Sequence, residues 1–284
     1  MAHDKVRLGQ IVGLYGPGAM LDLPERSVLV RSIDDWEMFG AGTFQSINEP
    51  RLSRLLFQRL ADQDGRLVAD HPPELRTPPI DPNDPKRIPP GVKATVFPLW
   101  FVCDAIAGDP PHRRRLVRFQ DLDPPRRLEH RGDDGKRRKA SPIRFVCGCE
   151  DGHLQDIDWR RILHQNGRDG PEAQAGQCRE QMWLEDGGTS ADPRDTRIVC
   201  DCGASLSLEQ LFQKGRLGPC RGERPWIGDR DPNGCTHDLR LLIRSATNTY
   251  FPQVAKVISL PQTLDELDRR IEAVWTAIAT CATT

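Results

Sequence analysis

Four cysteines in the last third of the chain constrain its fold more than any other feature. They are Cys200, Cys202, Cys220 and Cys235, and each lies beside a glycine-containing turn signal. A structural zinc ion needs four such ligands, with sulfur at about 2.3 Å, and a tight turn commonly supplies two of them. The Cys-x-Cys spacing is tighter than the usual pair with two intervening residues. We predict that these four cysteines form a zinc site, the alternative being burial as small apolar residues.

A second group of cysteine and histidine residues precedes the first. Cys149, His153, His164 and Cys178 are spread over a longer and less regular stretch, and Cys147 could replace one of them. Thiolate and imidazole are both ordinary zinc ligands, so these residues predict a second, weaker tetrahedral site. The alternative is that the two histidines only form hydrogen bonds within a loop.

Composition limits the classes of protein to which the chain can belong. Its 284 residues are enough for one large domain or two modest ones. Hydrophobic residues make up 37% and aromatic residues 6%, so we expect a thin core that metal sites would help to stabilise. The formal net charge of −1 excludes a global attraction to nucleic acid, so any such contact would need a local basic surface.

Cysteine usage and the termini indicate the compartment. The chain has nine cysteines, an odd number, and residues 1–7 lack the apolar stretch of a secretory signal. No segment is long and apolar enough to predict a membrane span. We therefore expect a cytoplasmic protein, where reducing conditions favour metal binding over disulfides.

The pattern of apolar residues, prolines and glycines predicts an α+β fold with irregular small sheets and short helices, stapled by one or two structural zinc sites. Proline-rich residues 71–92 are typical of an extended loop or linker. Strands are expected near residues 28–30, 95–102, 143–146 and 239–243, and helices near 53–60 and 206–212. The predicted parts are an N-terminal α/β subdomain (1–70), the linker (71–92), a cysteine-rich zinc-stapled domain (93–260) and a C-terminal amphipathic helix (261–284).

Residues 113–139 form a basic segment, with eleven basic and five acidic side chains and a net charge of +6. Interpreted as a mobile loop, it could bind a phosphate backbone without sequence specificity, since arginine suits phosphate well. The alternative is a solvated surface loop. The candidate nucleic-acid-binding residues are Arg113, Arg114, Arg115, Arg126, Arg127, Arg137, Arg138 and Lys139.

The C-terminal segment has the clearest helical pattern. Thr263 and Glu266 have the spacing of a capping box. Apolar residues from Leu264 to Ile278 then recur along one stripe, which we expect to be buried on this domain, on a partner or on further protein.

Five motifs together resemble the DrmB family of DISARM anti-phage defence proteins. They occur in the family's order and extend over most of the chain. The matching segments are Gln10–Pro24 (QIVGLYGPGAMLDLP), Arg144–Trp159 (RFVCGCEDGHLQDIDW), Val199–Gly203 (VCDCG), Cys220–Trp226 (CRGERPW) and Arg244–Pro252 (RSATNTYFP).

The resemblance implies a partner role. DrmB-like proteins associate with DrmA, a helicase that binds DNA and hydrolyses ATP, and the pair acts against incoming phage DNA. This chain has no Walker motif, so ATP chemistry would belong to the partner. The family continues into a C-terminal domain with its own cysteine cluster, so we expect this chain to correspond to an N-terminal half.

Three functions remain open from the sequence. The first is a non-catalytic, zinc-containing subunit that partners a DrmA-like helicase and assists the binding of foreign DNA. The second is a metal-dependent nuclease that uses His153 with Asp151, Asp156 and Asp158. The third is a structural adaptor without DNA contact.

Overall fold

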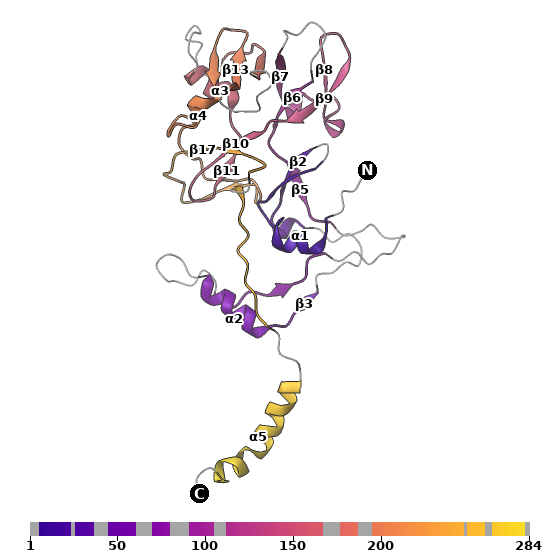
Figure 1. The fold of residues 1–284 in the computed structure, drawn as a ribbon, viewed down its shortest axis with the longest axis vertical. Helices are drawn as coiled ribbons and strands as arrows, with labels where there is room; N and C mark the ends of the chain where they lie inside the picture. The colour runs from indigo at the N-terminus through magenta and orange to yellow at the C-terminus, as the bar shows by residue number, and fades with distance from the viewer. Residues whose placement is uncertain are drawn as a thin grey trace. The chain divides into compact units, whose positions relative to one another are not determined.

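The computed structural model describes residues 6–23, 26–36, 45–60, 70–79, 91–104, 112–166, 177–186, 195–246, 249–258 and 263–281. The chain divides into two compact units. The first comprises Met1–Gly42 and Pro79–Pro252, and the second comprises Thr43–Pro78 and Gln253–Thr284. Both are mixed α and β structures, so the predicted α+β class is confirmed at that level (Figure 1).

A seven-stranded antiparallel sheet dominates the first unit, with strand order β14-β13-β12-β7-β6-β9-β8. Beside the central strand β7 lie β6 and β12, which are largely apolar runs, and the Trp-Phe-Val-Cys run of β6 is buried along its whole length. This burial on both faces explains why these strands show no alternation of polar and apolar residues. The strands are β6 (Trp100–Cys103), β7 (Arg113–Arg118), β8 (Glu129–Arg131), β9 (Arg137–Pro142), β12 (Met182–Glu185), β13 (Arg197–Cys200) and β14 (Ser205–Ser207).

Two three-stranded sheets and a short hairpin complete the first unit. One sheet has the order β11-β10-β17, from β10 (Phe145–Gly148), β11 (Leu154–Gln155) and β17 (Arg240–Ile243). The other has the order β1-β2-β5, from β1 (Met20–Asp22), β2 (Ser27–Val30) and β5 (Ala94–Val96). The hairpin pairs β15 (Glu223–Arg224) with β16 (Asp229–Arg230).

The pairing of β2 with β5 affects the predicted domain boundaries. Val28 pairs with Val96, so one sheet contains strands from both sides of the predicted linker 71–92. Residues 80–90 of that linker lie outside the described part of the chain. Residues 20–30 therefore belong to the same unit as the cysteine-rich region.

Short helices cover the core of the first unit. They are α1 (Leu8–Gly13), α3 (Trp159–Asn166) and α4 (Leu208–Leu211), with 3-10 turns η1 (Ile33–Asp35), η2 (Phe119–Asp121) and η3 (Pro125–Arg127). Helix α4 lies within the predicted range 206–212 and begins after Ser207, whose hydroxyl accepts a hydrogen bond from the Glu209 backbone N–H at 3.3 Å. Trp159, Ile162 and Leu163 of α3 are buried in the main core, against which the side chains of Cys149, Cys178, Cys202 and Cys235 pack.

The second unit consists of α2 (Pro50–Arg59), a two-stranded pairing of β3 (Ser46–Ile47) with β4 (Leu75–Arg76), and α5 (Thr263–Cys281). The structure confirms the two predicted helices. In α5, Leu267, Ile271 and Val274 of the predicted apolar stripe are exposed. Among the described helices, none combines the length and apolar character needed to cross a bilayer.

The basic segment 113–139 is not a mobile loop. Its residues form β7, η2, η3, β8 and the start of β9, all within or beside the seven-stranded sheet. The sequence does not reveal this strand, because β7 begins with three half-buried arginines and only its Leu116 and Val117 are buried. The physical reason for the correction is that cross-strand hydrogen bonds fix the backbone of most of this segment.

Candidate metal centres

The structure brings all eight predicted metal-ligating residues into two groups of four. Cluster A contains Cys149, His153, Cys220 and Cys235, and cluster B contains His164, Cys178, Cys200 and Cys202. Within each cluster, one ligand atom from every residue lies within 4.8 Å of the other three. Each cluster therefore offers three thiols and one imidazole, a common donor set of structural zinc sites.

The division into clusters differs from the one predicted. The sequence grouped Cys200 and Cys202 with Cys220 and Cys235, whereas the structure places the two pairs in different clusters. The physical reason lies in strand pairing. Antiparallel β10 and β17 pair Gly148 with Arg240, which brings Cys149 to the segment that contains Cys235.

Cluster B depends on a different hairpin. Strands β12 and β13 are antiparallel and pair Met182 with Cys200, and the Asp201 backbone N–H donates to the Gln181 carbonyl at 3.0 Å. Cys200 and Cys202 therefore lie beside the segment that begins at Cys178. Helix α3 supplies the fourth donor, His164. The order along the chain is thus nested, with all of cluster B between the two halves of cluster A.

The separations between ligand atoms suit a tetrahedral metal site. Four sulfur ligands at about 2.3 Å from one centre lie about 3.8 Å from one another. The Cys149 and Cys235 Sγ atoms are 3.8 Å apart in cluster A, and the Cys178 and Cys200 Sγ atoms are 3.6 Å apart in cluster B. The shorter metal–nitrogen bond matches the 3.3 Å between Cys202 Sγ and His164 Nε2. The clusters could hold a metal ion, and their geometry is consistent with zinc.

Tight turns position the local ligand pair of each cluster. In cluster A, the Gly152 N–H donates to the Cys149 carbonyl at 3.1 Å, and Gly152 has φ of +79°. In cluster B, the Gly203 N–H donates to the Cys200 carbonyl at 2.9 Å, and Gly203 has φ of +97°. Glycine adopts these positive φ values without strain, which explains its place in both turns.

The second ring nitrogen of each histidine has a partner that orients the imidazole. In cluster A, His153 Nε2 lies 3.3 Å from Asp231 Oδ2, while Nδ1 lies 3.4 Å from Cys149 Sγ. In cluster B, His164 Nδ1 lies 2.6 Å from the Arg160 carbonyl oxygen. Such outer contacts fix the tautomer and direct the other nitrogen at the metal. Sequence reasoning missed Asp231, which has no distinguishing sequence pattern.

Burial and hydrogen bonding act in opposite directions on the thiols. Burial raises the pKa of Cys200 and of Cys220 to about 12. Burial also opposes ionisation of Cys202, but hydrogen bonds, led by that from the Ala204 backbone, bring its pKa down to about 7. Three thiolates in one cluster need positive charge beside them, and a bound divalent cation supplies it.

Cys147 does not belong to either cluster. It is buried, and its thiol donates to the Gln155 carbonyl at 3.3 Å. Burial raises its pKa well above the ordinary range. The sequence-based suggestion that Cys147 replaces a ligand is therefore corrected.

The acidic residues suggested for a nuclease site do not converge. Asp156 is held by the backbone N–H groups of Leu99 at 2.6 Å and Ile157 at 2.9 Å, and burial raises its pKa to about 7. Asp158 accepts from the Arg161 N–H at 3.2 Å, at the start of α3. Within the described part of the chain, neither aspartate belongs to a group of potential metal ligands.

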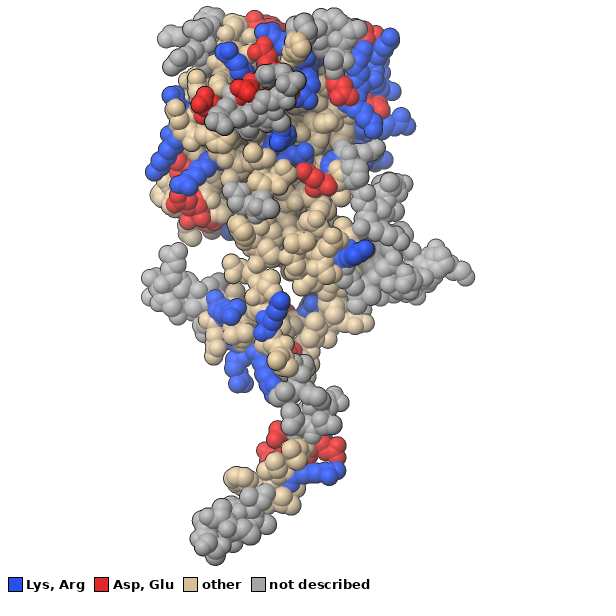
Figure 2. All heavy atoms as spheres, in the orientation of Figure 1, with Lys and Arg blue, Asp and Glu red and all other residues tan. Residues whose placement is uncertain are grey.

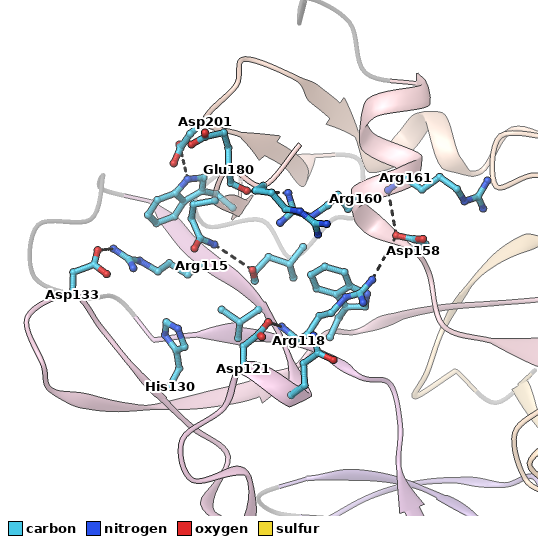
Figure 3. A pocket seen from close by; sticks show the side chains of 17 residues that line it. Arg115, Arg118, Asp121, His130, Asp133, Asp158, Arg160, Arg161, Glu180 and Asp201 are labelled. Atoms are coloured by element: carbon cyan, nitrogen blue, oxygen red, sulfur yellow. Dashed lines mark hydrogen bonds and ion pairs between the residues drawn. The ribbon is translucent and has the colours of Figure 1, made fainter. Parts of the chain in front are cut away.

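A polar pocket of about 730 Å³ adjoins cluster B (Figure 3). Two buried indoles, those of Trp100 and Trp183, line it, and the guanidinium groups of Arg118 and Arg115 lie 4.9 Å and 5.3 Å from the respective ring centroids. Five arginines and five carboxylates line the pocket, so their formal charges cancel. Arg179 and Asp201 of its wall are sequence neighbours of Cys178 and of Cys200 and Cys202. Cluster B thus holds this wall in place.

Most of the predicted nucleic-acid-binding arginines are engaged in ion pairs. Arg113 contacts Glu185 at 2.5 Å, Arg115 contacts Asp133 at 2.8 Å, and Arg138 contacts Asp134 at 2.7 Å. Arg114 pairs with Asp186, and Arg137 lies 3.4 Å from Asp123. Arg126 and Arg127 of η3 are exposed, and the described residues offer them no ion pair. Lys139 takes part in an interaction of its own.

Comparison with known proteins places this geometry in a family. Residues 7–251 match the model of a family described as a domain of unknown function, DUF8724. The match covers most of the chain, which therefore belongs to this family.

The chain is also similar to a curated DISARM protein. Over 143 residues the chain is 27% identical to the DISARM protein DrmB of Bacillus paralicheniformis. The aligned stretch covers 50% of this chain and 24% of that protein, so the match spans about a quarter of the relative's length. The resemblance to DrmB is confirmed as a distant similarity.

Proposed function

We propose that this member of the DUF8724 family is a zinc-stabilised, non-catalytic subunit of a DISARM-type anti-phage defence system. The similarity to the DISARM protein DrmB over half of the chain is the observation that supports this proposal most directly. Two clusters of three cysteines and one histidine support the zinc, since their spacing suits tetrahedral coordination. The protein works in the cytoplasm, where reducing conditions keep the thiols available for metal.

In this proposal the chain itself performs no chemistry. The zinc ions, when bound, are structural, because each cluster presents four protein ligands and leaves no open position for water or substrate. A DrmA-like helicase supplies ATP hydrolysis, and this subunit assists the binding of foreign DNA. Further protein equivalent to the remainder of DrmB is a candidate partner as well.

Co-purification and phage plating test the proposal together. The wild-type chain should co-purify with a tagged DrmA-like helicase from the same organism and should be needed for protection against phage. A Cys149→Ser/Cys200→Ser variant, with one ligand removed from each cluster, should lose both properties. Cys147→Ser is the matched control, because this buried cysteine lies outside both clusters and serine can still donate to the Gln155 carbonyl. The proposal would be contradicted if the wild-type chain failed to co-purify with the helicase, or if cells lacking the chain were fully protected.

Nuclease activity is tested separately on the purified chain. We expect no loss of DNA substrate in the presence of Mg²⁺ or Mn²⁺, because Asp156 and Asp158 are engaged by the backbone. Metal-dependent cleavage that Asp156→Ala abolishes would refute the non-catalytic role.

A structural adaptor without DNA contact is the second candidate. The ion pairs of Arg113, Arg114, Arg115, Arg137 and Arg138 favour it, because paired guanidinium groups are less available to phosphate. Reversing the charges of Arg113–Arg115 and of Arg137 and Arg138 in the helicase complex distinguishes the two candidates. If this segment binds DNA, affinity falls, and unchanged affinity supports the adaptor or another DNA-binding surface.

A further inference from the structure

Helix α2 in the second unit carries half-buried apolar residues and exposed basic residues. Leu52, Leu55, Leu56 and Phe57 are half-buried. The Ser53 hydroxyl donates to the Pro73 carbonyl at 2.8 Å, which ties the helix to the segment that contains β4. These contacts determine which side of α2 faces outward.

Three arginines are the basic residues of α2. Arg51, Arg54 and Arg59 are exposed, and the ten residues of α2 include no acidic side chain. Arg51 and Arg54 lie on neighbouring turns at the spacing that places helical side chains together. The nine residues from Arg51 to Arg59 span about 12 Å of helix axis. We call these three residues the α2 arginine surface.

The α2 arginine surface differs in its ion pairing from the arginines of β7 and β9 in the basic segment 113–139. Across the described ranges, no carboxylate forms an ion pair with Arg51, Arg54 or Arg59. In the same unit, Arg76 pairs with Glu74 and Arg270 pairs with Glu266, each at 2.7 Å. Figure 2 shows the same contrast, with blue and red spheres intermixed near β7–β9 and blue spheres mostly among tan ones at α2.

Guanidinium groups on a helix, with no ion pair to the described carboxylates, suit a partner with regularly spaced phosphates. Each guanidinium can form two parallel charge-assisted hydrogen bonds to one phosphate. Double-stranded DNA presents about one charge per 1.7 Å of its axis, or roughly seven over the length between Arg51 and Arg59. Several phosphates are therefore within reach of this surface, whichever base sequence is present.

We infer that the α2 arginine surface binds the phosphate backbone of nucleic acid, in place of the ion-paired arginines of β7 and β9. The inference rests on the proposed function, in which the subunit assists DNA binding. It locates that contact on the second unit, and it predicts binding that is insensitive to base sequence and sensitive to salt.

A pair of charge-matched variants tests the inference in the full-length chain. The first is Arg51→Gln/Arg54→Gln/Arg59→Gln, because glutamine keeps a high helix propensity. The control is Arg113→Gln/Arg137→Gln/Arg138→Gln. Both remove three positive charges, so a general effect of net charge would weaken them equally. Binding to a fluorescein-labelled DNA duplex of mixed sequence is measured by anisotropy between about 50 and 200 mM salt.

We expect the α2 variant to lose at least about tenfold in affinity at low salt, and its salt dependence to fall by about 0.9 in log–log slope for each lost contact. The control should stay close to wild type. Circular dichroism and metal content should be unchanged in both variants, which excludes misfolding as the cause. The same series on single-stranded DNA, with its shallower slope per contact, shows which form of the backbone the surface prefers.

Three results would overturn the inference. They are wild-type affinity and slope in the α2 variant, equal losses in both variants, or lost helicase binding with unchanged DNA affinity, which would indicate an acidic protein partner. Loss of DNA binding in the α2 variant alone supports it, even if the chain fails to protect against phage or to bind a helicase. Those two failures would count against the proposed function instead.

Discussion

Clusters A and B use the same donors, three thiols and one imidazole, but they are built from different parts of the fold. Cluster A joins the β10–β11 turn to the segment 220–235, and cluster B joins α3 to the β12–β13 hairpin. Cluster A closes the longer loop, from Cys149 to Cys235, and all of cluster B lies inside that loop. The same ligand chemistry thus has two structural roles in this unit. Cluster B fastens a local hairpin, and cluster A joins segments that are far apart in the chain.

The partition of ligands gives the largest expected effect. Double variants within one cluster, such as Cys149→Ser/Cys235→Ser, should retain one zinc ion per chain, because the other cluster keeps all its donors. Double variants across clusters, such as Cys200→Ser/Cys235→Ser, should retain none. Structural zinc contributes roughly 10 kcal/mol or more of apparent binding free energy, so the across-cluster variant should be far less stable. Mass spectrometry and thermal unfolding measure both quantities.

The grouping predicted from sequence order places Cys200 and Cys235 in one site. It would be supported if Cys200→Ser/Cys235→Ser retained one zinc ion and Cys149→Ser/Cys235→Ser retained none. Cys147→Ser, outside both clusters, should keep two zinc ions. This control separates loss of a ligand from loss of any buried cysteine.

The segment between His153 and His164 links the two clusters, and Asp156 anchors it. Burial raises the pKa of Asp156 to about 7, against the opposing hydrogen bonds from Leu99 and Ile157. Folding therefore takes up a proton between about pH 4 and 7, and the free energy of unfolding falls as the pH rises through this window. The contribution is on the order of 1 kcal/mol per pH unit.

Asp156→Asn should remove this part of the pH dependence, because asparagine does not titrate. Chemical denaturation of both proteins at several pH values measures the difference between their slopes. The difference between the two slopes reports the protonation of Asp156 alone, because the protonation of the metal ligands contributes equally to both proteins. Identical slopes would mean that Asp156 is ionised in the folded protein.

The next effect concerns the groups that orient the two histidines, which differ between the clusters. Asp231→Asn should weaken the metal affinity of cluster A by roughly 10–100-fold, because His153 loses the carboxylate that orients its ring. Cluster B should be unaffected, since a backbone carbonyl orients His164. Competition with a zinc-binding dye can resolve the two sites. Equal weakening of both would show that the clusters are coupled rather than independent.

The smallest expected effect concerns Arg160, which supports cluster B alone. Its guanidinium donates to the Cys178 carbonyl at 2.8 Å and to the Glu180 carbonyl at 3.1 Å. Arg160→Met should lower stability by about 1 kcal/mol and loosen only cluster B, because the backbone carbonyl that binds His164 remains. Hydrogen exchange of residues 177–181 measures this loosening. Faster exchange around Cys149 instead would contradict the assignment of Arg160 to cluster B.

The extent of sequence-based prediction differs between elements. Helices α2, α4 and α5 and strands β2, β10 and β17 have local signals, namely an apolar period, a capping serine or a short apolar run, and all lie where expected. Helix α3 and the strand role of residues 113–118 were missed. The first has a polar and aromatic composition, and the second has arginines at a half-exposed strand end that read as a loop.

The sequence by itself determined the identity of the eight candidate ligands, because cysteine and histidine beside turn residues are a local chemical pattern. It also determined the resemblance to DrmB. Only the tertiary structure decided which ligands meet, because the pairing of β10 with β17 and of β12 with β13 brings together residues far apart in the chain. The same holds for charge. In the folded chain Asp186 and Asp133 form ion pairs with arginines of β7, whereas no described carboxylate pairs with the arginines of α2. Contacts between distant residues depend on the register of the folded chain, which local composition does not specify.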